Sequence, residues 1–161
     1  MGEMTSTLPW LSLAIFVPIV AGILVLITGS DERADFTRKL ALFGSVISFL
    51  VTLPVYFGFD GSTAQMQFVE KTPWIDAFSA TYHLGVDGIS MWLVLLTSFI
   101  TVIVVLAGWE VITKRVAQYM AAFLILSGLM VGVFAALDGL LFYIFFEATL
   151  IPMYIIIGVW G

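Results

Sequence analysis

The residue best suited to chemistry in this chain is Glu147, which lies in the apolar run Gly139–Gly161 as its only acidic or basic member. At a helical rise of about 1.5 Å per residue it comes about 12 Å along that run. A hydrocarbon core is about 30 Å thick, so Glu147 is predicted well inside it. A carboxylate at that depth costs about 2.5–3.5 kcal/mol even on the mildest insertion scale, and such residues usually mark ion or proton paths. Glu147 is therefore predicted to act in ion movement, with a purely structural hydrogen-bonding role as the alternative.

Three residues near Glu147 could support it. Tyr143 and Tyr154 share its predicted helix face, so their phenol groups can hydrogen-bond or hold water near the carboxylate. Pro152 has no backbone N–H and frees the carbonyl of Ala148, which predicts a kinked, locally hydrated helix. A carboxylate inside a membrane stays ionised only beside a cation. No Lys or Arg of this chain is predicted at membrane depth, so either Glu147 is neutral or its partner lies outside these residues.

The composition identifies the element that must position these side chains as a membrane helix. The chain has 161 residues, of which 61% are hydrophobic and 11% charged, whereas a soluble domain carries roughly 25% charged residues. All but one of the Asp, Glu, Lys and Arg residues lie outside five apolar runs. We therefore expect an all-α integral membrane protein that forms a single transmembrane domain over residues 1–161. The predicted helices cover residues 5–29, 40–59, 88–109, 116–137 and 140–160.

The connections between these helices differ in kind. Residues 60–87 are predicted to form a short extended or hairpin-like outer segment, interrupted at Thr72-Pro73-Trp74. Asp87 and Asp138 each precede a predicted helix and are expected to cap its N-terminus. The dipeptide Asp138-Gly139 also predicts a tight turn that makes the last two helices antiparallel neighbours.

The basic residues predict the orientation of the chain in the membrane. Five of the six fall in two connections on the same side, and the opposite side has only Lys71. By the positive-inside rule, the N-terminus is expected outside and the last helix is expected to end inside. The five residues that carry this prediction are Arg33, Arg38, Lys39, Lys114 and Arg115.

Several kinds of site are not expected. Six Lys and Arg residues in small groups do not form a nucleic-acid-binding surface. The absence of cysteine excludes disulfides and cysteine-ligated iron–sulfur clusters within the chain. His83 is the only histidine, so we expect a surface or packing role for it and no metal site. No nucleotide-binding motif is present, so no cofactor and no redox catalysis are expected within this chain.

Three stretches of the sequence are similar to one known family. They are TyrHisLeuGlyValAspGlyIleSer at residues 82–90, the run at residues 131–138, and the run at residues 141–161, which contains PhePheGluAlaThrLeuIleProMetTyr. These runs closely resemble the subunit M or chain 4 family of NADH–quinone oxidoreductase, respiratory complex I. The resemblance extends from about residue 67 to residue 161. Members of that family are antiporter-like subunits of the membrane arm of the complex.

The resemblance implies a role for Glu147. It corresponds to a family glutamate that pairs with a lysine on a later helix and serves a proton half-channel, coupled to electron transfer from NADH to quinone. Family members have more than five helices, so this chain is expected to be the N-terminal third of a longer subunit. NADH, flavin, iron–sulfur clusters and quinone are implied elsewhere in the complex, and ubiquinone is one form of that quinone.

The resemblance also implies the surroundings of the chain. Its expected partners are other membrane-arm subunits, the lipid bilayer and protons, with no nucleic acid. Its expected location is the bacterial cell inner membrane or the mitochondrial inner membrane. Two alternatives remain at this point: a subunit of a multisubunit cation/proton antiporter, which shares the helix glutamate but has no redox chemistry, and a non-transporting membrane scaffold.

Overall fold

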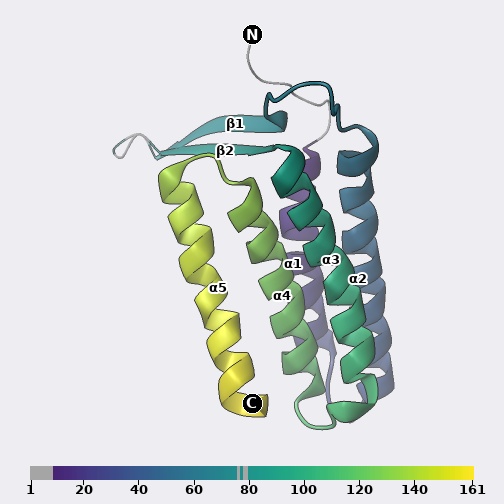
Figure 1. The fold of residues 1–161 in the computed structure, drawn as a ribbon. Helices are drawn as coiled ribbons and strands as arrows, with labels where there is room; N and C mark the ends of the chain where they lie inside the picture. The colour runs from purple at the N-terminus through teal and green to yellow at the C-terminus, as the bar shows by residue number, and fades with distance from the viewer. Residues whose placement is uncertain (1–8, 76, 78–79) are drawn as a thin grey trace.

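Five long helices and a small antiparallel sheet make up the structure of the protein. The computed structural model describes residues 9–75, 77 and 80–161. In Figure 1 the helices run side by side, and the two strands lie across one end of the bundle. All five helices are long and apolar enough to cross a membrane, which confirms the predicted fold class. The elements are α1 (Trp10–Thr28), α2 (Ala34–Phe57), β1 (Gln67–Ile75), β2 (Ala80–Val86), α3 (Gly88–Val111), α4 (Val116–Ala135) and α5 (Gly139–Trp160).

Several helix boundaries differ from the prediction by one or more residues, and two of them differ for identifiable reasons. Helix α2 was expected at residues 40–59 but begins at Ala34, so Arg38 and Lys39 belong to its first turns. The hydrocarbon core disfavours charged side chains, but a helix accommodates them, and these turns lie at the end of the span. Helix α4 ends at Ala135 because Ala136 forms a bridge with Leu84, and the N–H of Leu137 donates to the carbonyl of His83 at 2.8 Å. Residues 5–8 of the first predicted helix lie outside the described residues.

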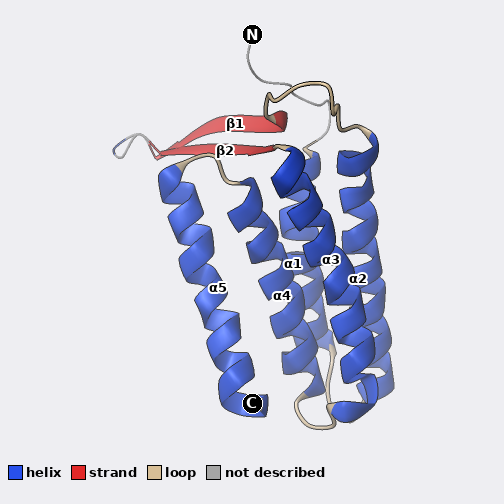
Figure 2. Cartoon of the chain, in the orientation of Figure 1, coloured by secondary structure: helices blue, strands red, loops and turns tan. Residues whose placement is uncertain are grey.

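The outer segment forms the predicted hairpin, but its turn lies later in the chain than expected. Strands β1 and β2 pair antiparallel, and Figure 2 shows this sheet as the only strand structure among the described residues. The predicted interruption at Thr72-Pro73-Trp74 is wrong, because these residues lie within β1, where Thr72 pairs with Tyr82 and Pro73 with Thr81. A two-stranded sheet consists of edge strands alone, so a proline without an N–H can be placed there.

Helix α4 occupies the centre of the bundle and uses two glycines to do so. A Cβ added at Gly128 would clash with the carbonyl oxygen of Ile15 on α1, and one added at Gly132 would lie 2.7 Å from the ring of Phe145 on α5. Glycines spaced in this way allow close helix approach in membranes. The two glycines therefore serve different neighbours, one on each side of α4.

Two helix N-termini are capped by the residue that precedes them, as predicted. The Asp87 carboxylate accepts hydrogen bonds from the backbone N–H groups of Ile89 and Ser90 at 3.0 and 2.8 Å. The Asp138 carboxylate accepts one from the backbone N–H of Leu141 at 3.1 Å. The first N–H groups of a helix have no partner within the helix, so these carboxylates supply one and also favour the positive end of the helix dipole.

Two further helix N-termini are capped by carboxylates from distant parts of the chain. Glu70 of β1 accepts from the N–H groups of Leu11 and Ser12 at 3.0 and 3.1 Å, at the start of α1. Asp31, in the α1–α2 connection, accepts from the N–H groups of Arg115 and Val116 at 2.9 and 2.8 Å, at the start of α4. These contacts tie the hairpin to one end of the bundle and two connections together at the other end.

The end of the bundle that carries most of the basic residues is also joined by carbonyl acceptors. The Arg38 guanidinium donates to the carbonyl of Ile112 at 3.0 Å, and the Trp160 indole N–H donates to the carbonyl of Lys114 at 3.0 Å. Arg33 donates to the carbonyl of Thr28. Each bond satisfies a carbonyl at or just beyond a helix end, where no helical donor is available.

We expect Gly128→Ala to destabilise the bundle, because the new Cβ would meet the backbone of α1 and force the helices apart. Overpacking of this kind costs about 1–3 kcal/mol. Gly158→Ala is the matched control, since no atom lies within 4 Å of a Cβ at that helical position. Thermal unfolding of the assembled protein should show a lower midpoint for the first variant only, and equal midpoints would contradict the account of the close approach.

We expect Asp31→Ala to leave the backbone N–H groups of Arg115 and Val116 without an acceptor, so hydrogen exchange at these two amides should become faster by a factor of about ten or more. The control Glu32→Ala should leave the exchange rates of these amides unchanged. The bonds to Val116 and Arg115 lower the pKa of Asp31 from 3.8. A lowered pKa means that the cap is fully present above pH 3.8 and is lost as the pH falls through the lower, folded value. Unchanged exchange in Asp31→Ala would show that this carboxylate does not cap α4.

Candidate functional site

Glu147 projects from the face of α5 that the rest of the bundle leaves uncovered. Helix α5 is the edge helix of the bundle and packs mainly on α4 and on β2. Its buried residues form one stripe that faces inward: Leu141, Phe145, Thr149 and Pro152. In the sequence Glu147 lies between Phe145 and Thr149 of this stripe, but its side chain is exposed on the opposite face of the helix. The helix thus places a carboxylate halfway along its length and away from the bundle core.

A shallow hollow on this outer face contains Glu147 together with Tyr154. Ala148, Leu150, Ile151 and Ile155 complete its lining. Tyr143 lies one turn before Glu147 and is 57% exposed, but it does not line the hollow. The structure therefore brings two of the predicted residues to one site and leaves Tyr143 beside it on the same face.

The side chain of Glu147 has neither a hydrogen bond nor an ion pair with any residue in the described part of the chain. The six basic residues lie in the connections, in β1 or in the first turns of α2, so none of them reaches the middle of α5. The one salt bridge among the described side chains joins Arg38 to Asp35 at 3.8 Å, at the end of the bundle. A carboxylate is thus held at mid-span with open space in front of it.

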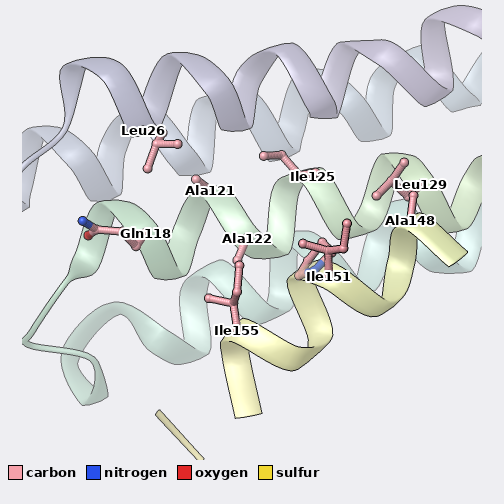
Figure 3. A pocket seen from close by; sticks show the side chains of 10 residues that line it. Leu26, Gln118, Ala121, Ala122, Ile125, Leu129, Ala148, Ile151 and Ile155 are labelled. Carbon is pink, nitrogen blue, oxygen red and sulfur yellow. The ribbon is translucent and has the colours of Figure 1, made fainter. Parts of the chain in front are cut away.

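Pro152 faces the other way, into the bundle. Helix α5 continues through it from Gly139 to Trp160, and its ring is buried. The predicted kink and local hydration at Ala148 stay predictions. Figure 3 shows the apolar groove that Pro152 helps to line with residues of α1 and α4, among them Leu26, Ala122 and Ile125; its volume is about 440 Å³.

Helix α5 separates this groove from the hollow of Glu147. Ala148, Ile151 and Ile155 line both, the groove on one side of the helix and the hollow on the other. Gln118 is the only member of the groove lining with a polar side chain. The arrangement keeps the inner side of α5 apolar, so any polar group or water that serves Glu147 has to approach from the outer face.

Sequence reasoning missed a second polar cluster, which lies between the hairpin and α1. The Ser12 hydroxyl donates to Glu70 and lies 2.7 Å from the hydroxyl of Tyr82. Burial raises the pKa of Tyr82 above 10.0, the hydrogen bond with Ser12 opposes this, and the Glu70 charge adds to it. Because the same carboxylate caps α1, the cluster holds the sheet on the bundle. No local motif marks it, since Ser12 and Glu70 are far apart in the chain.

His83 and the remaining acidic residues do not form a second candidate site. His83 lies within β2, where it pairs with Lys71, and its carbonyl accepts from Leu137. Over residues 9–75, 77 and 80–161, no group of three or more His, Cys, Asp or Glu side chains could hold a metal ion. Glu147 and its hollow are therefore the site with the clearest potential for chemistry.

Comparison with known families gives a match over most of the chain. The family described as NADH-ubiquinone oxidoreductase chain 4, amino terminus, matches residues 13–135, which include α2, α3, α4 and most of α1. This matched stretch ends before α5 and Glu147.

Individual relatives extend the match to nearly the whole chain. NADH-quinone oxidoreductase subunit M of Rickettsia felis is 39% identical over 158 residues, which cover 96% of this chain and 32% of the relative. The protein of the same name from Rhodobacter capsulatus is 48% identical over 154 residues, or 94% of this chain and 30% of the relative. NADH-ubiquinone oxidoreductase chain 4 of Arabidopsis thaliana is 44% identical over 151 residues, again 94% and 30%. The chain spans about a third of the length of these curated relatives.

Proposed function

Since this chain belongs to the family of NADH-quinone oxidoreductase subunit M and NADH-ubiquinone oxidoreductase chain 4, we propose that it serves proton translocation in such a complex and that Glu147 is the residue that exchanges protons. The observation that carries the proposal is the position of Glu147, a single carboxylate at mid-span on the uncovered face of α5. An intramembrane carboxylate usually faces a partner or a path for ions.

The hollow in front of Glu147 suggests how the proton moves. The carboxylate takes up a proton to become the neutral acid and releases it again, with no other bond made or broken. The hydroxyl of Tyr154, which lines the same hollow, can hold a water molecule that delivers or accepts the proton. The apolar inner side of α5 keeps this exchange on the outer face, because water that entered the groove of Figure 3 would find few polar partners there.

The charge of Glu147 needs a counterpart when the carboxyl is ionised. No basic residue of this chain lies near it, so we propose that a basic side chain from another part of the complex, a lysine by the family resemblance, faces the hollow. A change in the distance between the two groups would alter the proton affinity of Glu147. The redox groups that drive such a change, namely NADH, flavin, iron–sulfur clusters and quinone, are proposed to lie in other subunits.

Of the two alternatives, the scaffold role remains a direct competitor. The family match favours the redox-driven complex over a separate cation/proton antiporter. A scaffold, in contrast, would use Glu147 only as a hydrogen-bonding group at a helix contact. A substitution that removes the charge of Glu147 but keeps a hydrogen-bonding side chain separates the proton-transfer role from the scaffold role.

We predict that Glu147→Gln lowers proton pumping and the coupled oxidation of NADH by at least about tenfold while assembly is retained, because a positioned proton-transfer group contributes on the order of 10²–10⁴ in rate. The matched control is Glu110→Gln, the same change at an exposed position near the end of α3. Quinone-dependent NADH oxidation and proton uptake are measured in membranes that carry each variant. Near-normal pumping in Glu147→Gln would leave only the hydrogen-bonding role.

We further propose that the end of the bundle with Arg33, Arg38, Lys39, Lys114 and Arg115 faces the inside and that the hairpin faces the outside. This orientation rests on the positive-inside rule, because five basic residues gather at one end and Lys71 alone lies at the other. The chain is a multi-pass membrane protein on either orientation.

The orientation can be tested with single cysteines, because the natural sequence contains none. Cysteine at Glu32 or Thr113 lies in an exposed connection at the basic end, and cysteine at Ala64 lies in an exposed position before β1. An impermeant thiol reagent added from the outside is expected to label position 64 only. Labelling of position 32 or 113 under these conditions would reverse the proposed topology.

A further inference from the structure

Ser127, at the middle of α4, has a buried hydroxyl without a partner in the described part of the chain. Its side chain is 3% exposed, and Oγ makes no hydrogen bond there. Other buried hydroxyls of the spans donate to a carbonyl of their own helix: Ser48 to Gly44 at 2.7 Å and Thr149 to Phe146 at 2.6 Å. Ser127 is the exception, so its hydroxyl is available to something outside α4.

Ser127 is one of the residues that line a cavity of about 240 Å³ between α3 and α4. Thr97 and Thr101 of α3 also line it, and both are satisfied as donors, by the carbonyls of Leu93 and Thr97 at 2.8 Å each. A hydroxyl oxygen that donates its proton still has lone pairs that accept. The lining therefore includes one residue whose hydroxyl has no partner in the described part of the chain, Ser127, and two whose hydroxyl oxygens can still accept, Thr97 and Thr101.

From this arrangement we infer that the α3–α4 cavity is a water-binding site in the membrane-spanning part of the protein. A water molecule can accept the proton of the Ser127 hydroxyl and donate to the oxygens of Thr97 and Thr101. An unsatisfied polar group in hydrocarbon costs several kcal/mol. A buried water needs about 10–15 Å³ and two to four polar partners. The cavity provides both.

The site is separate from that of Glu147. Every residue that lines the cavity belongs to α3 or α4, and none belongs to α5. On the face of α3 that packs against α2, the hydroxyl of Ser98 already has partners. It bonds to carbonyls of its own helix and lies 3.2 Å from the hydroxyl of Thr52 on α2. The inferred water would link α3 to α4 as Ser98 and Thr52 link α3 to α2.

The direct test is a structure of the assembled complex at a resolution that shows ordered water. We expect density within about 3.2 Å of the Ser127 oxygen. That density should be absent in Ser127→Ala and retained in Ser48→Ala, an equally buried serine whose hydroxyl is satisfied within α2. A lipid acyl chain or a side chain of another subunit in the cavity, or an empty cavity, would overturn the inference.

A double-mutant cycle tests the same inference by stability. Ser127 and Thr101 share no direct hydrogen bond, so a bridging water would couple two hydroxyls that otherwise do not interact. We expect Ser127→Ala and Thr101→Val each to lower the unfolding midpoint of the complex. The double variant should lower the midpoint by less than the sum of the two single effects. In the control cycle, the effects of Ser48→Ala and Thr101→Val should be additive. An unchanged or raised midpoint in Ser127→Ala, or simple additivity with Thr101→Val, would show that no water connects them.

Discussion

Polar groups inside a bilayer have to find their partners within the protein, because hydrocarbon offers none. A similar need arises at both ends of the helices, where the first N–H and the last carbonyl groups have no partner within the helix. Carboxylates accept from the first N–H groups of α1, α3, α4 and α5, and side chains of Arg33, Arg38 and Trp160 donate to carbonyls at or beyond helix ends. The connections and the hairpin are thereby held against the bundle, and the helices that carry the candidate sites are fixed in position.

Glu147 stands out against this background because it is a charged type of residue in the middle of a span, and the described chain supplies no partner for its side chain. Helix α5 has fewer buried positions than α4, and its outer face carries Glu147, Tyr143 and Tyr154 in exposed positions. The contrast between the carboxylates that cap helices at the ends of the bundle and an unpaired carboxylate at mid-span is the physical basis of the proposed function. Its chemistry depends on what approaches this face in the assembled complex.

The spans, their local caps and the position of Glu147 within α5 could be predicted from the sequence, because apolar length and the residue before a helix are local signals. The caps from Glu70 and Asp31 could not, since each joins segments that are far apart in the chain and no short-range pattern records the contact. The placement of Pro73 inside β1 depends on its pairing with Thr81, which is also non-local. For the candidate site, the sequence indicates the shared face of Glu147 and Tyr154 but not the inward orientation of Pro152.

We expect Glu147 to change its protonation state when the complex works. Infrared difference spectroscopy of the complex during NADH oxidation measures this directly, through the C=O stretch of a neutral carboxyl group. The account predicts a band that appears or disappears with turnover, shifts on selective isotope labelling of glutamate and is missing in a complex in which Glu147 is replaced by Gln. A difference spectrum that is identical with and without Glu147 would contradict it.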